Sequence, residues 1–108
     1  MPWIWVFASS TIAQASPTLA LSNTARTGLW AWAKTAAADL RDSGITLNLA
    51  CPGYHATDRM IELGFASSGR PMGDPAGFGR VVAFLCSQAA ANVNGARIVV
   101  DGGESLAI

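Results

Sequence analysis

A long helical pattern lies between two short runs that are typical of buried strands, and this order limits the folds open to the chain. The first run, Trp3 to Ala8, is continuously apolar and rich in residues that favour β-structure. A serine–proline pair at 16–17 begins a helix that we expect to run from Pro17 to Ser43, with Gly44 as its stop. A second strand is expected over Ile45 to Ala50. Strand, helix and strand in this order predict parallel strands joined by a helical crossover.

The second half of the chain repeats this alternation. Asp74-Pro75 is a typical helix start, and the apolar residues that follow recur at helical spacing: Phe78, Val81, Val82 and Leu85. Arg97 to Asp101 (RIVVD) then predicts a third strand. The whole order is βαβαβ, so we predict an α/β fold with three parallel strands and two main helices in one domain over residues 1–108.

Composition and charge exclude several classes of function. The chain of 108 residues has a formal net charge of zero and only 13% charged residues, so nothing favours nucleic acid or an acidic partner. It has no run near the ~20 apolar residues of a membrane span. Residues 1–16 include an apolar run and a small-residue site at Ala13-Gln14-Ala15, as a signal peptide does. A signal peptide also has a basic residue before its apolar run, and this chain has none there. We therefore expect a cytoplasmic protein without a membrane partner.

The cysteines and tryptophans add two expectations. Cys51 and Cys86 lie in apolar runs without a spaced ligand pattern, so we expect buried, reduced thiols and no metal site. Trp30 and Trp32 project about 200° apart around the first helix, so they cannot both face the same sheet. One is expected to meet a second surface, for which a partner subunit is the simplest candidate. A homo-oligomer formed through helix 17–43 is therefore predicted.

Two motifs border the central strand, at whose carboxyl end open α/β sheets bind ligands. Gly44 to Asn48 reads G-I-T-L-N, and Pro52 to Thr57 reads P-G-Y-H-A-T. Ser9-Ser10 ends the first strand, and Val100 to Gly103 reads V-D-G-G. In these motifs the chain resembles the short-chain dehydrogenases/reductases. The resemblance covers nearly the whole chain and implies the C-terminal part of a Rossmann-like domain, from its fifth strand onward, without the glycine-rich nucleotide-binding half.

The resemblance implies an oxidoreductase that transfers a hydride between NAD or NADP and a small carbonyl or alcohol substrate, of the 3-oxoacyl reductase kind. In the family a tyrosine exchanges the substrate proton, a lysine four residues later lowers its pKa and holds the nicotinamide ribose, and a serine polarises the carbonyl. These catalytic positions are Ser22, Arg26 and Ser10 here, with Ser9 as a near alternative to Ser10.

The cofactor contacts follow from the same resemblance. Pro52, Gly53 and Thr57 match the family's contacts to the nicotinamide amide and the phosphates. Arg26 stands where the lysine holds the ribose. The structural alternatives are a plain Pro-Gly turn and ordinary hydroxyl groups at a strand end.

The Ser22/Arg26 exchange restricts the chemistry. A phenol titrates near 10, whereas an alkyl hydroxyl is a much weaker acid, and one nearby cation does not close that gap. Arg26 still offers a permanent charge that favours a developing oxyanion. Ser22 could instead only cap or pack the first helical turns. His55, beside the only tyrosine, has a suitable pKa for general acid catalysis, although a solvated loop histidine is the simpler interpretation.

The sequence has three further interpretations. The chain could be a non-catalytic remnant or dimerising module, whose first strand becomes a sheet edge that pairs with another chain. Gly73, Gly77 and Gly79 match the spacing of a nucleotide-binding loop, but no strand is predicted before them and Pro75 lacks an amide hydrogen, which indicates chance. A hydrolase built from Ser9 or Ser10 with His55 and Asp58 lacks a G-x-S-x-G turn, and its histidine and aspartate are only three residues apart.

Overall fold

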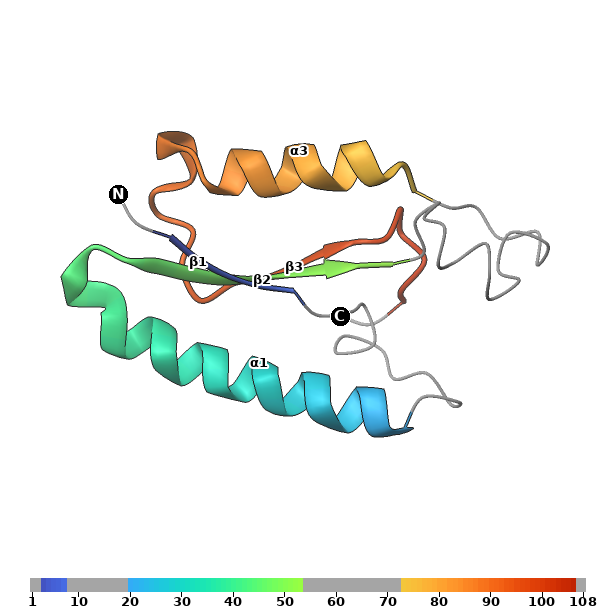
Figure 1. Cartoon of the computed structure of the whole chain (residues 1–108), viewed down its shortest axis with the longest axis horizontal. Coiled ribbons are helices and arrows are strands. Elements are labelled where there is room, and N and C mark those ends of the chain that lie inside the picture. The colour runs from blue at the N-terminus through green and yellow to red at the C-terminus, as the bar shows by residue number, and fades with distance from the viewer. Residues whose placement is uncertain (1–2, 8–19, 54–72, 107–108) are drawn as a thin grey trace.

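The structure is a computed structural model of the chain, and it describes residues 3–7, 20–53 and 73–106 (Figure 1). The elements in chain order are β1 (Trp3–Phe7), α1 (Ala20–Leu40), the short 3₁₀ helix η2 (Arg41–Ser43), β2 (Thr46–Pro52), α3 (Pro75–Leu85), the short 3₁₀ helix η4 (Gln88–Ala90) and β3 (Arg97–Val100). The order of strands and helices is the predicted one.

The described strands form one parallel sheet in the order β1–β2–β3. Trp3 pairs with Thr46 at one end of the β1–β2 ladder, and Pro52 pairs with Val100 at the end of the β2–β3 ladder. Helix α1 covers one face of the sheet and α3 covers the other (Figure 1). This layered arrangement confirms the predicted α/β class.

Helix α1 packs on the central strand through small residues. Ala33 and Ala37 are buried against Leu47, Leu49 and Cys51, which project from one face of β2. Two alanines at this contact let the helix lie close to the sheet, and the alternating side chains of β2 fill the space between them. The apolar core of this face is therefore formed where α1 crosses β2.

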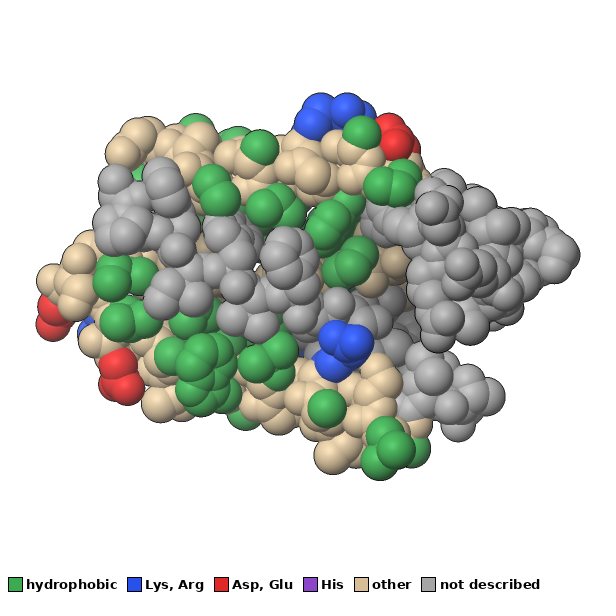
Figure 2. All heavy atoms as spheres, in the orientation of Figure 1, with side chains coloured by type: hydrophobic (Ala, Val, Ile, Leu, Met, Phe, Trp, Pro, Cys, Tyr) green, Lys and Arg blue, Asp and Glu red, His purple; other side chains and the backbone are tan. Residues whose placement is uncertain are grey.

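The two tryptophans of α1 have different surroundings, as predicted. Trp30 packs against the buried cluster, whereas Trp32 is 53% exposed and Leu21 is 88% exposed. Figure 2 shows hydrophobic side chains at the surface over both helices on one side of the molecule. The outer surface of α1 therefore keeps large apolar groups in contact with solvent.

The predicted bounds of the first helix need correction at its C-terminal end. The α-helix ends at Leu40, and residues 41–43 form a 3₁₀ turn before Gly44. Gly44 has a left-handed φ of 70°, and its amide donates to the carbonyl of Arg41 at 3.2 Å. Glycine tolerates this φ, which explains why the helix stops here. The predicted start at residues 17–19 lies outside the described residues.

The strand bounds also differ from the prediction. Strand β2 begins at Thr46 and continues to Pro52, beyond the predicted end at Ala50, because its ladder with β3 extends to Val100. Pro52 is tolerated as the last residue of the strand, where one missing amide donor disrupts little. Strand β3 ends at Val100 because the next residue, Asp101, begins a tight loop.

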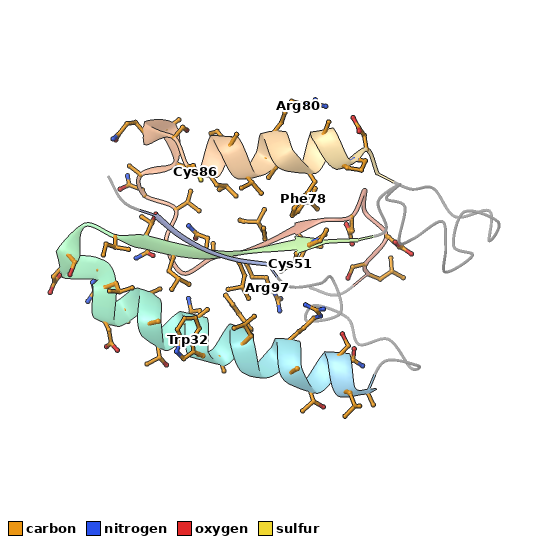
Figure 3. The ribbon with its side chains drawn as sticks, in the orientation of Figure 1. Trp32, Cys51, Phe78, Arg80, Cys86 and Arg97 are labelled. Atoms are coloured by element: carbon orange, nitrogen blue, oxygen red, sulfur yellow. The ribbon has the colours of Figure 1, made fainter. Side chains whose placement is uncertain are left out.

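Helix α3 begins as predicted. The Asp74 side chain accepts a hydrogen bond from the amide of Ala76 at 3.1 Å, and Pro75 occupies the first helical turn. Figure 3 shows Phe78 pointing toward the sheet and Arg80 pointing away from it. Gly77 donates to the carbonyl of Asp74 at 2.9 Å, inside the helix start. Its amide is therefore not presented to a phosphate, which supports the interpretation of the glycine spacing as chance.

Two asparagines connect β2 to the loop before β3. Buried Asn48 donates to the carbonyl of Val93 at 2.9 Å and accepts from the amide of Ala96 at 3.0 Å. Asn94 accepts from the amide of Leu47 at 2.9 Å. These side chains satisfy backbone groups that the sheet leaves unpaired at this end. They hold β2 and β3 in register, which places the opposite ends of both strands side by side.

Candidate functional site

Helix α1 begins at the end of the sheet where β2 and β3 stop (Figure 1). This follows from the crossover between the parallel strands β1 and β2, because the connecting helix has to run antiparallel to them. The first turns of α1, which carry Ser22 and Arg26, therefore lie at the same end of the sheet as Pro52 and Gly53. The fold brings these four predicted site residues to one end of the molecule.

Ser22 and Arg26 contact each other directly. The Nε of Arg26 donates to the Oγ of Ser22 at 3.0 Å, and both residues are half-buried. Their separation of four residues places them one turn apart on one helix face. A hydroxyl has one donor and two acceptor positions, so accepting from Arg26 still lets Ser22 donate its own hydrogen.

This pair has a restricted chemistry. The Arg26 charge lowers the energy of negative charge on a nearby oxygen, and the Ser22 hydroxyl can donate a hydrogen bond to the same oxygen. Neither group is a proton donor of ordinary strength, because an arginine in a protein keeps its proton. The pair is therefore suited to polarising a carbonyl and not to delivering a proton.

The turn after β2 requires glycine. The amide of Gly53 donates to the carbonyl of Val100 at 3.0 Å, which continues the ladder past the end of the strand. A Cβ atom at this position would lie 2.6 Å from the Cβ of Asp101 and 2.9 Å from its Cα. Such distances are too short for carbon atoms, so a side chain would force the two turns apart.

The facing turn is held by the Asp101 carboxylate. Its Oδ1 accepts from the amide of Gly103 at 2.9 Å, and its Oδ2 accepts from the amide of Ser105 at 2.8 Å. Gly102 and Gly103 both have left-handed φ values, 65° and 83°. The sequence places Asp101 in the V-D-G-G motif, but the motif alone did not predict this role of its side chain. An aspartate before two glycines is a recognisable sign of a side-chain-capped turn.

The other predicted residues belong to two further segments of the chain. The predicted catalytic residue Ser10 and the predicted cofactor contact Thr57 lie outside the described residues, as do Ser9, Tyr54, His55 and Asp58. The alternative acid and the hydrolase set therefore stay predictions that the structure does not address. Of the six predicted site residues, four lie in described parts of the chain.

Cys51 is not poised for chemistry. Burial raises the pKa of its thiol to about 11, although the nearby Arg97 guanidinium lowers it. Figure 3 shows Arg97 beside Cys51, between the sheet and α1. Arg97 also lies 5.7 Å from the centroid of the Trp30 ring, and Lys34 lies 5.5 Å from it. These cations support packing of α1 on the sheet, and the thiol stays protonated at neutral pH.

The described part of the chain contains neither a metal-binding cluster nor a membrane-spanning helix. Within residues 20–53 and 73–106, no three histidine, cysteine, aspartate or glutamate side chains group closely enough to hold a metal ion. No helix among the described residues is long and apolar enough to cross a bilayer.

Arg26 also has the donors to bind a cofactor. Ser22 takes its Nε–H, and a guanidinium carries four further N–H groups in a planar fork. Such a fork fits the paired hydroxyls of a ribose or a phosphate. The donor chemistry of this end of α1 therefore suits the ribose of a nucleotide cofactor.

Known proteins resemble this chain in both sequence and structure. Residues 4–105 match the family described as enoyl-(acyl carrier protein) reductase. The 3-oxoacyl-(acyl-carrier-protein) reductase FabG of Vibrio cholerae is 33% identical over 88 residues, which cover 73% of this chain and 36% of the relative.

Two solved structures share the fold. An NADPH-bound short chain oxidoreductase of Pseudomonas aeruginosa with an atypical catalytic centre has a TM-score of 0.87 at 21% identity, over 98% of this chain and 47% of that one. The angucycline C-6 ketoreductase LanV with bound NADP has a TM-score of 0.82 at 27% identity, over 95% of this chain and 44% of that one. The chain spans about a third to a half of the length of these proteins. The sequence match over residues 4–105, together with the fold, shows that the chain belongs to the short-chain dehydrogenase/reductase family.

Proposed function

We propose that this chain supplies the substrate-facing part of an NAD(P)-dependent oxidoreductase site that interconverts carbonyl and alcohol groups, with 3-oxoacyl groups as the substrate class. The observation that carries the proposal is the Arg26–Ser22 hydrogen bond, at the end of the sheet where β2 delivers Pro52 and Gly53. The similarity to a 3-oxoacyl reductase supports the substrate class.

Each site residue has its own role. Arg26 holds the nicotinamide ribose and stabilises negative charge on the substrate oxygen, while Ser22 and Ser10 donate hydrogen bonds to that oxygen. Pro52, Gly53 and Thr57 contact the nicotinamide amide and the phosphates. The bound cofactor would supply or accept the hydride. These roles follow the family pattern at matching positions, and the exchange of tyrosine for serine predicts slow proton transfer.

Nucleotide binding is the first test. NADH and NADPH are titrated into the chain while tryptophan fluorescence is followed, because all four tryptophans lie in β1 and α1. Saturable quenching in the micromolar range supports the proposal, and the two titrations determine which nucleotide is preferred. Quenching by neither nucleotide, with a folded protein, would refute it.

A pair of variants locates the binding site. Arg26→Ala removes the proposed ribose donor, and we expect it to weaken binding at least tenfold, which corresponds to about 1.4 kcal/mol. Arg41→Ala is the matched control, because Arg41 is exposed and lies in η2 at the opposite end of β2. Equal loss of binding in both variants would contradict a site at the start of α1.

A second candidate function, a dimerising module without catalysis, is favoured by the outer surface of α1. Leu21, Ala25, Gly28 and Trp32 are all exposed and lie within about 60° of one another around the helix. None of them is charged. Residues 21 and 32 are equidistant from the midpoint between residues 26 and 27, and so are residues 25 and 28. Antiparallel packing of two copies would therefore set Leu21 against Trp32 and Ala25 against Gly28, as a twofold interface requires.

Sedimentation velocity tests this dimer. We expect the wild-type chain to sediment as a dimer and Trp32→Glu to sediment as a monomer, because the charge would be buried in the contact. Phe84→Glu on α3 is the control, since Phe84 is 52% exposed and Trp32 is 53% exposed. Identical sedimentation of the wild type and Trp32→Glu would rule out this surface.

We also place the chain in the cytoplasm. Cys51 is a buried free thiol. Free thiols are typical of a reducing compartment. Recovery of a tagged chain from the soluble fraction of gently broken cells is the expected result, and its appearance in the medium would contradict this location.

A further inference from the structure

We propose that Asp101 is a positioning residue for the Pro52–Gly53 turn and that, through this turn, it sets the affinity of the site for a nicotinamide nucleotide. The inference rests on the proposed function for the identity of the ligand. Asp101 follows a different strand, β3, and its side chain acts through Gly53 and not by contact with substrate.

The first step is the contact between the two turns. Pro52 and Val100 are partners in the ladder, so β2 and β3 end side by side and their next residues, Gly53 and Asp101, face each other. The 2.6 Å from an added Gly53 Cβ to the Asp101 Cβ shows that the two turns lie too close for any residue but glycine at position 53. The backbone of Gly53 therefore lies directly against Asp101, and a displacement of Asp101 is expected to alter the position of Gly53.

The second step is what holds Asp101 in place. Its two carboxylate oxygens accept separate backbone amides, from Gly103 and Ser105, and its carbonyl accepts from the amide of Glu104 at 3.3 Å. Hydrogen bonds to a charged acceptor are among the stronger ones in proteins. The carboxylate thus folds residues 102–105 back over its own backbone, and the two left-handed glycines make that path accessible.

The third step concerns what a substitution changes. In Asp101→Asn one oxygen still accepts an amide, but the new NH₂ group is a donor and cannot accept from Ser105 or Gly103. One of these two amides then loses its hydrogen-bond acceptor, while the shape of the side chain is kept. Because Gly53 packs directly on Asp101, we expect the Pro52–Gly53 turn to sample more positions.

The test compares nucleotide binding with stability. We expect Asp101→Asn to raise the Kd for NADPH or NADH about tenfold while the melting temperature falls little, and Asp101→Ala to raise the Kd further. Asp42→Asn is the matched control, since Asp42 is exposed and precedes β2 at the other end of the sheet. Unchanged Kd in Asp101→Asn, or the same change in both variants, would overturn the inference.

A second readout does not depend on nucleotide. Amide hydrogen exchange of Gly53, resolved by NMR, is expected to accelerate in Asp101→Asn and to stay unchanged in Asp42→Asn. If the wild-type chain binds neither nucleotide, the proposed function fails, and so does the affinity part of this inference. The positioning role is then decided by the amide exchange rate of Gly53 alone, and an unaltered rate in Asp101→Asn would refute it.

Discussion

Replacement of Asn48 gives the clearest test of how the strand ends are placed. Asn48 is 1% exposed, and its side chain serves one carbonyl, that of Val93, and one amide, that of Ala96. Asn48→Ala removes both bonds and leaves both backbone groups without their partner. At about 1–2 kcal/mol for each bond, we expect the free energy of unfolding to fall by about 2–4 kcal/mol.

The conservative variant divides that loss. Asn48→Asp keeps an oxygen that accepts from the amide of Ala96, but it loses the amide donor to the carbonyl of Val93. We therefore expect the bond to Ala96 to persist and the bond to Val93 to be lost. It also places a charge in a buried position, which adds a cost that disappears when the carboxyl is protonated. Lowering the pH is therefore expected to recover part of the stability of Asn48→Asp and none of that of Asn48→Ala.

Urea unfolding followed by circular dichroism measures these differences. Asn92→Ala is the control, because Asn92 is exposed in the loop that contains Val93 and Ala96. We expect Asn48→Ala to lose the most free energy of unfolding and Asn92→Ala the least. The value for Asn92→Ala should stay within about 0.5 kcal/mol of wild type. If Asn48→Ala unfolded at the same urea concentration as Asn92→Ala, the side-chain bonds would not be what holds β2 against the loop.

Three further predictions follow from single sites. The Cys51 thiol should react slowly with iodoacetamide at pH 8 in the folded chain and rapidly in urea. Because its pKa rises from 9.0 to about 11 on folding, the unfolded chain loses this proton at lower pH than the folded chain. The free energy of unfolding should therefore fall as the pH rises from about 9 to about 11. Gly44→Ala should lower the free energy of unfolding by about 1 kcal/mol, because alanine does not favour the left-handed φ of this position. Gly79→Ala should raise it by about 0.5–1 kcal/mol, because Gly79 lies inside α3 with open space around it. Urea unfolding measures both changes. Arg26→Lys should retain nucleotide binding better than Arg26→Ala but weaken it above about pH 10, where lysine deprotonates and arginine does not, as a fluorescence titration at several pH values would show.

Local patterns predicted the elements well where the cause is local. The spacing of apolar residues and the stop at Gly44 predicted α1, and the four-residue separation predicted that Ser22 and Arg26 share a face. The opposite surroundings of Trp30 and Trp32 also followed from helical geometry alone. These features depend on residues within one or two turns of each other, and a sequence displays such relations directly.

Features that depend on distant residues were missed. Pro52 was expected after the strand, but its pairing with Val100 keeps it in the ladder. The role of Asp101 depends on the backbone of Gly53, almost fifty positions earlier, which only the folded sheet brings close. Asn48 was predicted as part of a motif, yet its bonds to residues 93 and 96 follow from the turn that precedes β3. Propensity and spacing do not contain these contacts.

The sheet order has a consequence for how copies of the chain can associate. Among the described residues, β1 and β3 are the outer strands, and each pairs on one side only. If β1 of one copy met β1 of another, a twofold axis would close the assembly at two chains. If β1 met β3 instead, each added copy would present a fresh β1 edge, and growth would continue as a filament. For copies that pair strand to strand, the choice between a closed pair and an open fibre would therefore depend on which outer strand is covered first.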